Sequence, residues 1–213
     1  MAKDKIKDEE LKTDFFLQFV GKAVDYFKNN QEQVQWVAIG IVVVIVVFAG
    51  IGRYHDHKSK KILLAFENTN TKLAIDEFLD LYKNNKYYPF VLFKKGNTLY
   101  EEKNYKGAVE AYTEIVDDYK KSPIADYALL NLGYSYQALG DYEKAVDAYS
   151  RMANDYKNSP FIGDATLNFA RSLMAKGDYK RAKDLIDSYI SDEPNSLIAD
   201  EAKKLLPEIT RNL

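Results

Sequence analysis

The sequence contains no cysteine and only two histidines among its 213 residues. Without cysteine the chain can form no disulfide, no thiolate metal site and no cysteine nucleophile. The histidines, His55 and His57, are two residues apart and would face different directions on a helix, so they do not predict a metal site. The motifs G-x-x-x-x-G-K-[ST], G-x-S-x-G and H-E-x-x-H are also absent. We therefore expect no enzyme, no metal and no other cofactor.

The chain also lacks a large excess of positive or negative charge, since its formal net charge is −2. Proteins that bind nucleic acid usually carry a clear positive excess, so we expect no nucleic-acid partner. The acidic pairs Asp117-Asp118 and Glu101-Glu102 lie where helix ends are expected, and we interpret them as solvated charge. A catalytic pair would need converging side chains with a buried partner. No small-molecule substrate is expected.

One stretch has no charged side chain at all: WVAIGIVVVIVVFAGIG, Trp36–Gly52. At about 1.5 Å per helical residue, residues 34–54 reach across a hydrocarbon core of roughly 30 Å. The run is too long for an ordinary strand, and in lipid only a helix satisfies its own backbone. Trp36 and Tyr54 stand at the two ends, where interfacial aromatic residues belong. The sequence predicts one transmembrane helix that contacts lipid through residues 34–54.

A cleaved signal peptide is the alternative for this apolar run. Signal peptides begin with a short basic segment, whereas here the preceding residues exceed thirty and their lysines are balanced by acids. No A-x-A cleavage site follows the run. We expect a permanent anchor.

The segment before the anchor, residues 1–33, has two parts. Met1–Glu10 is a charged leader that we expect to be solvated and mobile. In Leu11–Asn30 apolar side chains recur at helical spacing, which predicts an amphipathic helix. These positions include Phe16, Val20, Ala23 and Phe27. Such a helix would dock on lipid headgroups or on a partner's membrane domain, or it would merely cover its own anchor.

Residues 55–213 carry a repeat with a step of 37 residues. The predicted units are a degenerate repeat 60–86, repeats 87–122, 123–159 and 160–196, and a capping helix 197–213. Two short helices are expected in Lys60–Asn85, the second containing Ala74, Phe78 and Leu81. Pro207 is expected to kink or end the capping helix.

Each full repeat predicts two helices joined by a turn. The turns fall at Asn104, Gly140-Asp141 and Gly177-Asp178, where glycine supplies a positive φ and the polar side chain can cap the next helix. In the second helices a small residue recurs at one equivalent position and a large residue four residues later. The small residues are Ala108, Ala145 and Ala182, and the large ones are Tyr112, Tyr149 and Ile186. A lone unit cannot bury such a face, but stacked units can.

The second copy shows the pattern best, with Leu129, Leu132, Gly133, Tyr136, Ala145, Tyr149 and Met152. This pattern resembles the tetratricopeptide repeat, whose usual length is about 34 residues. The additional residues fall in the joints "KSP" and "NSP", which resemble those of BamD-type and CpoB-type envelope repeats. In the first copy, Lys95 stands where the pattern has leucine. The resemblance implies a helical-hairpin solenoid, so that with the predicted span the expected fold is all-α, a single transmembrane helix followed by this solenoid.

The full layout resembles the YfgM-type ancillary subunit of the SecYEG translocon. That resemblance implies a bacterial inner-membrane protein with a cytoplasmic N-terminus and periplasmic repeats. Its implied partners are translocon subunits, a periplasmic chaperone or an unfolded client. Basic residues favour the reverse orientation, because more of them follow the anchor than precede it. They are Lys22 and Lys28 before it, and Arg53, Lys58, Lys60, Lys61 and Lys72 after it.

In the tetratricopeptide repeat fold that this pattern resembles, the first helix of each repeat lines the concave side. The predicted lining residues are Phe90, Phe93, Asn97, Tyr100, Tyr127, Leu130, Tyr134, Gln137, Leu167, Arg171 and Met174. Aromatic, amide and thioether side chains suit an extended polypeptide, although about half of them would serve simply to pack the repeats together. We expect a membrane-anchored interaction protein that assists secreted or envelope proteins near the translocon. The alternative is an assembly scaffold that faces the cytoplasm or sits on an organelle membrane.

Overall fold

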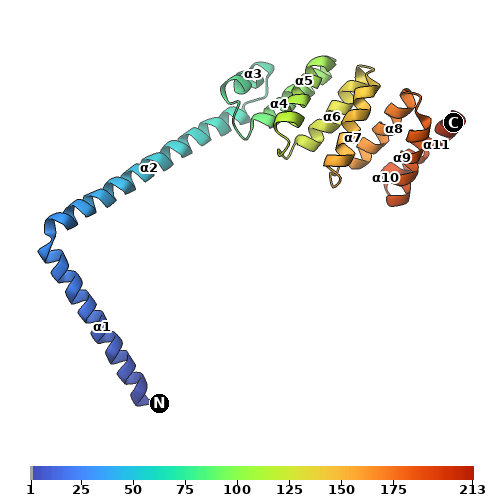
Figure 1. The fold of residues 1–213 in the computed structure, drawn as a ribbon. Helices are drawn as coiled ribbons and strands as arrows, with labels where there is room; N and C mark the ends of the chain where they lie inside the picture. The colour runs from blue at the N-terminus through green and yellow to red at the C-terminus, as the bar shows by residue number, and fades with distance from the viewer. Residues whose placement is uncertain (1) are drawn as a thin grey trace. The chain divides into compact units, whose positions relative to one another are not determined.

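The structure, a computed structural model, describes the backbone of residues 2–213 and the side chains from residue 15 onward. Every regular element in residues 2–213 is an α-helix, which confirms the predicted all-α class (Figure 1). The chain divides into two compact units, residues 1–61 and residues 62–213. The predicted solvation of the leader Met1–Glu10 falls on side chains outside the described residues.

The N-terminal unit consists of α1 (Ala2–Asn29) and most of α2 (Gln31–Glu67). The sequence predicted that the first helix begins at Leu11, but α1 already begins at Ala2. Asn30 separates the two helices: its backbone N–H and its side-chain Nδ2 both donate to the carbonyl oxygen of Tyr26, at 3.0 and 2.9 Å. The carbonyl of Asn30 then accepts from the N–H of Val34 at 3.0 Å, which starts α2.

The predicted span, residues 34–54, lies inside α2, which is long and apolar enough to cross a membrane by length and composition. The prediction of a separate short helix from Lys60 is wrong, because α2 continues without a break to Glu67. The sequence RYHDHKSKKILLAFE after Gly52 contains no glycine or proline to stop the helix, and its lysine, arginine and leucine residues favour helix.

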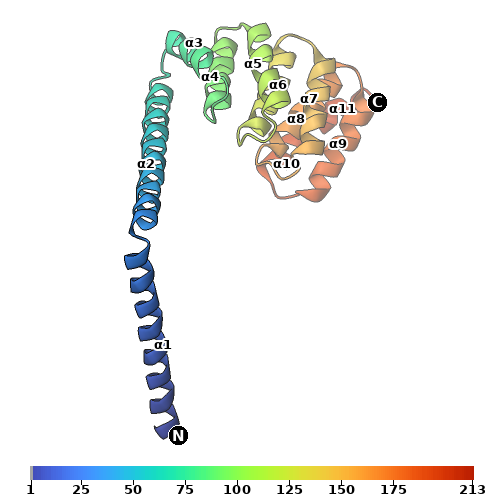
Figure 2. The same ribbon diagram turned by 60° about the vertical axis from the view of Figure 1, so that its left-hand side comes forward.

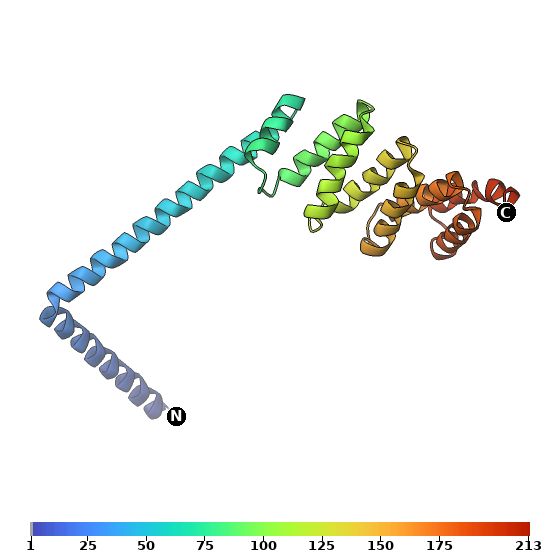
Figure 3. The ribbon, with the colours of Figure 1, turned by 45° about the horizontal axis from the view of Figure 1, so that its top comes forward.

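The repeat unit is a series of hairpins with a regular step. After α3 (Lys72–Leu81) come α4 (Tyr88–Glu101), α5 (Tyr105–Asp118), α6 (Ala125–Ala138), α7 (Tyr142–Asp155), α8 (Ile162–Ala175) and α9 (Tyr179–Asp192). Each helix from α4 to α9 has 14 residues. Equivalent helices begin 37 residues apart, the step predicted from the sequence. Figures 2 and 3 show the hairpins stacked side by side.

The turns within the repeats have the predicted chemistry in two copies of three. Gly140 and Gly177 have φ values of 74° and 80°, which glycine adopts without steric cost. In the first repeat the equivalent residue is Lys103, with φ at 60°. The next residue caps the following helix in all three copies: the side chains of Asn104, Asp141 and Asp178 each accept from a backbone N–H at 3.2 Å.

Close packing inside each hairpin depends on small residues. Ala108, Ala145 and Ala182 are fully buried at the start of the second helices. In the second repeat the ring of Tyr149 lies directly against Gly133. The hydroxyl of a second tyrosine, Tyr156, donates to the carbonyl of Lys120 at 3.3 Å and so joins one repeat to the previous one. The first repeat has the equivalent bond, from Tyr119 to Lys83 at 3.1 Å.

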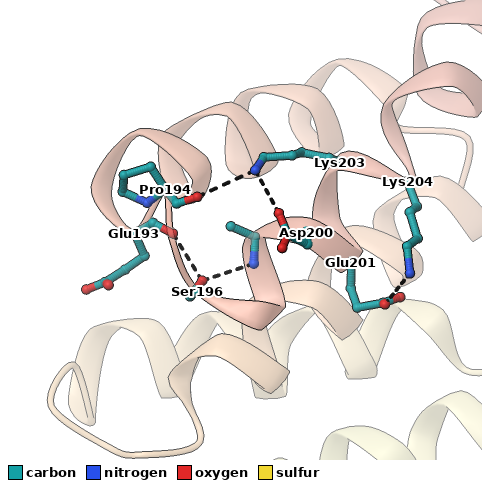
Figure 4. A network of polar contacts seen from close by, with 8 residues as sticks. Glu193, Pro194, Ser196, Asp200, Glu201, Lys203 and Lys204 are labelled. Carbon is teal, nitrogen blue, oxygen red and sulfur yellow. Dashed lines mark hydrogen bonds and ion pairs between the residues drawn. The ribbon is translucent and has the colours of Figure 1, made fainter.

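The C-terminus folds as α10 (Leu197–Lys203) and α11 (Leu206–Arg211) rather than as one capping helix. Figure 4 shows Ser196 at the start of α10, where its hydroxyl accepts from the N–H of Ala199 and donates to the carbonyl of Glu193, both at 3.0 Å. The break between α10 and α11 falls just before Pro207, where the sequence predicted that the capping helix would kink or end, and Pro207 itself lies in the first turn of α11. A proline ring clashes with the carbonyl four residues earlier, here that of Lys203, where α10 ends.

Candidate functional site

The eleven predicted lining residues lie on α4, α6 and α8, the first helices of the three full repeats. Phe93, Leu130 and Leu167 are buried and belong to the hydrophobic core between repeats. Arg171 is exposed. The others are half-buried, namely Phe90, Asn97, Tyr100, Tyr127, Tyr134, Gln137 and Met174. The structure therefore divides this set into a packed base and an accessible layer.

Gln137 is fully engaged by the protein itself. Its Oε1 accepts from the hydroxyl of Tyr149 at 2.9 Å. Its Nε2 donates to Ser172 Oγ at 2.8 Å and to the carbonyl of Asn168 at 3.1 Å, both on α8. Gln137 thus fixes the buried tyrosine of its own hairpin and joins the second repeat to the third. This side chain holds the face in shape rather than reaching toward a ligand.

Asn97 makes the corresponding bond in the first repeat, but from a different position. It accepts from the hydroxyl of Tyr112 at 2.6 Å, and it lies one helical turn before the position equivalent to Gln137. At that equivalent position the first repeat has Tyr100, whose ring packs edge-on against Tyr105 with centroids 5.2 Å apart. The buried hydroxyls of Tyr112 and Tyr149 are therefore both hydrogen-bonded to a side-chain amide, which stands one helical turn earlier in the first repeat than in the second.

Aromatic rings connect the starts of the first helices across the repeats. The ring of Tyr127 lies 5.0 Å from that of Phe93 and stacks on that of Phe161 at 4.5 Å, with an interplanar angle of 16°. Because both neighbours hold the ring, the conformational freedom of Tyr127 is already reduced in the folded protein.

The accessible polar part of the face lies on α6 and α8. Arg171 Nη1 donates to Asn168 Oδ1 at 3.4 Å, and Asn168 Nδ2 donates to the hydroxyl of Tyr134 at 3.5 Å. Burial raises the pKa of Tyr134 to about 12, and the charge of Asp164 adds to this while Arg171 opposes it. The phenol is therefore neutral at physiological pH and can both donate and accept a hydrogen bond.

Sequence reasoning missed Asn168 and Asp164 as members of this face. The repeat step would have found Asp164, which stands 37 residues after the predicted lining residue Tyr127, but not Asn168, whose equivalent Asn131 was not predicted to line the face either. The face then combines a neutral phenol, an amide, one guanidinium and the thioether of Met174. These groups can bury apolar side chains and bond a peptide backbone. Among the described side chains, no three histidine, aspartate or glutamate groups converge as metal ligands would.

The repeat unit also has concave regions away from this face. Clefts of about 520 and 500 Å³ open at two joints and are lined by equivalent residues, Tyr119 in one and Tyr156 in the other. Both hydroxyls already bond to a carbonyl of the preceding joint. These clefts lie at the joints between repeats and are lined mainly by charged and polar residues, whereas the face of α6 and α8 places neutral hydrogen-bonding groups beside apolar side chains.

Stacked helical hairpins with an apolar and amide-bearing face define a repeat protein of the class that binds other proteins. The chain belongs to the tetratricopeptide repeat-like domain family, whose model matches residues 25–200. The match includes the apolar segment of α2 as well as the repeats. No curated protein matches the chain.

Among solved structures, the chain is similar to the repeats of a putative kinesin light chain from Podosopora anserina. A variant of that protein has a TM-score of 0.55 at 14% identity, covering 73% of this chain and 88% of that one. A second structure of the same repeats has a TM-score of 0.54, with the same identity and coverage. The Arabidopsis OM64 repeat domain has 23% identity and a TM-score of 0.48 over 61% of this chain and all of that one. At these identities the kinesin light chain structures show the fold alone.

Proposed function

We propose that this protein is a non-enzymatic, membrane-anchored interaction module whose repeats bind an extended segment of another polypeptide. The observation that carries the proposal is the accessible layer on α6 and α8, where Tyr134, Arg171 and Met174 stand beside the buried Leu130 and Leu167. Apolar surface next to neutral hydrogen-bonding groups suits a chain that offers both side chains and unpaired backbone amides.

The membrane anchor is proposed from the surface of α2. Side chains along its apolar run, such as Val42, Ile45 and Phe48, are more than half exposed, and no other residue of the N-terminal unit covers them. A continuous apolar surface of this length is unfavourable in water and is satisfied in lipid. A cleaved signal peptide fits less well, because the helix continues to Glu67, beyond any short leader.

For the orientation, we propose a cytoplasmic N-terminus and periplasmic repeats in a bacterial inner membrane, close to the Sec translocon. The support is the resemblance of the layout to the YfgM-type subunit. The alternative, a scaffold facing the cytoplasm or on an organelle membrane, is favoured by the basic residues that follow the anchor, Arg53 and Lys58 among them. A compartment-dependent reporter fused after Leu213 separates the two. A cytoplasmic signal would remove the translocon proposal in favour of the scaffold.

Binding is tested by photo-crosslinking in cells from single sites on the repeats. A photoreactive amino acid at Tyr134 or Arg171 is expected to capture secreted clients, a chaperone or translocon subunits. The matched control is Asp147, which is exposed on α7, away from the lining helices. Equal capture from Asp147 and Tyr134 would show that the proposed face is not the binding surface. Met174→Ala should reduce capture from Tyr134, and because Met174 also packs against the core, the capture is compared at a temperature where thermal unfolding shows the variant to be fully folded.

A further inference from the structure

The helix α1 carries an apolar face that the rest of the N-terminal unit leaves uncovered. Phe15 is 74% exposed and Phe16 63% exposed, and Phe19, Val20 and Phe27 are exposed as well. At about 100° per residue the apolar positions fill roughly 200° of the helix circumference, from Phe15 round to Leu17. The remaining arc carries polar or small residues, namely Gln18, Gly21, Lys22, Asp25, Lys28 and Asn29.

The aromatic content makes this face costly to leave in water. Burying one such side chain stabilises a protein by roughly 1.5–3 kcal/mol, so the face needs a partner surface. The partner must accept a long and rather flat apolar strip. It must also accept Lys22 and Lys28, which flank Asp25 on the polar side.

The position of α1 along the chain indicates which surface is nearest. Asn30 is the only residue between α1 and α2, and it is six residues before Trp36, where the apolar run begins. Six helical residues rise about 9 Å, and the headgroup region on each side of a bilayer is roughly 5–8 Å thick. If α2 spans the membrane, the end of α1 is therefore held at the level of the headgroups, with no linker to carry it away.

We propose that α1 lies along the lipid surface, with its phenylalanine-rich face at the boundary between headgroups and acyl chains. Its polar arc then faces water, where Lys22 and Lys28 can reach lipid phosphates. The inference rests on the proposed span, because the span is what holds α1 at the membrane. The protein would then be attached by two elements, one that crosses the bilayer and one that lies on it.

The test uses the full chain, which has no cysteine, so single cysteines can be labelled cleanly. Ala23→Cys and Asp25→Cys are a matched pair, because two residues along a helix place the labels on opposite faces. Val44→Cys reports on the span. Each variant, with an environment-sensitive fluorophore, is reconstituted into vesicles of phosphatidylethanolamine and phosphatidylglycerol that contain a lipid-borne quencher.

We expect labels at Ala23 and Val44 to emit at shorter wavelength and to lose emission to the lipid quencher, while the label at Asp25 does neither. The inference would be overturned if the label at Val44 were quenched while the labels at Ala23 and Asp25 both emitted as in water and were not quenched. That result would leave the proposed span in place. A label at Ala23 that is shielded from water but not quenched by lipid would also overturn it, since another copy of the chain would then cover the face. An unquenched label at Val44 would instead contradict the proposed span.

Discussion

Gly133 lies so close to Tyr149 that a Cβ on the glycine would come within 2.4 Å of the ring atom Cε1. The first repeat has the same arrangement, with 2.6 Å between the position of a Cβ on Gly96 and Cε1 of Tyr112. In the third repeat both members change together, to Ala170 and Ile186, and both are fully buried. The glycine and the aromatic ring thus depend on each other, because the ring fits only where the residue facing it on the first helix of the hairpin has no side chain.

Gly133→Ala is therefore expected to destabilise the repeat unit by about 1–3 kcal/mol, because the ring of Tyr149 is held by Gln137 and cannot move aside freely. Adding Tyr149→Ile reproduces the pair found in the third repeat and should recover part of that loss. Urea unfolding followed by tyrosine fluorescence measures the single and double variants. Strictly additive effects of the two changes would contradict the proposed coupling.

Lys103 occupies a turn position that favours glycine, with φ at 60°. Lys103→Gly is expected to raise the free energy of unfolding by about 0.5–1 kcal/mol, since glycine removes the strain but adds freedom to the unfolded chain. The reverse change at an equivalent turn, Gly140→Lys, should lower the free energy of unfolding by a similar amount. If both changes left thermal unfolding unaltered, these turns would not be limited by backbone strain.

Thr113 Oγ1 is buried on α5 and has no hydrogen-bond partner among the described residues. Thr113→Val keeps the shape and removes the unsatisfied hydroxyl, so we expect a gain of about 1 kcal/mol in urea unfolding. Thr98→Val is the control, because the hydroxyl of Thr98 donates to the carbonyl of Lys94 at 3.0 Å. That variant should be neutral or slightly destabilised. A loss of stability in Thr113→Val would mean that the hydroxyl has a partner in solution.

Alkaline pH should destabilise the repeats through their buried tyrosines. In the folded protein the pKa of Tyr134 is about 12, whereas an exposed tyrosine has a pKa of about 10. As the pH rises the unfolded chain loses this proton first, so the stabilisation is complete below about pH 10 and is lost between about pH 10 and 12. Burial also raises the pKa values of Tyr112 and Tyr149.

Urea unfolding at about pH 8 and about pH 11 measures this effect. Tyr134→Phe should make the decrease in the free energy of unfolding smaller over that interval, with little change at the lower pH. The same decrease in the variant and the parent would show that Tyr134 does not contribute to the pH dependence.

The sequence was sufficient for the fold because its strongest signals are local and repeated. Gly140 with Asp141 specifies the end of one helix and the start of the next, and the same pair at Gly177 and Asp178 confirms the period. Helix boundaries were predicted less well where no breaker marks them. The residues from Arg53 to Glu67 favour helix and include no breaker, so the change from apolar to charged side chains marks the end of the predicted span and not the end of α2.

The roles of individual lining residues could not be predicted from the pattern. Asn97 and Gln137 both looked like groups available to a ligand, but each is occupied by the hydroxyl of a tyrosine on the opposite helix. Such bonds depend on side-chain geometry across two helices and not on spacing in the sequence. Asn168 was missed for the opposite reason, since its neighbours Tyr134 and Arg171 come together only when the repeats stack.

The tyrosine bonds described above are distributed unevenly along the solenoid. The first and second repeats each have a hydroxyl that bonds an amide within the hairpin and another that bonds the preceding joint. The third repeat has Ile186 and Glu193 at those two positions and can form neither bond. In a linear array stabilised by nearest neighbours, the third repeat then depends on its apolar packing, on the bonds that Gln137 makes to α8, and on α10 and α11, which pack against it. The two C-terminal helices thus supply part of the support that the tyrosine hydroxyls give to the first and second repeats.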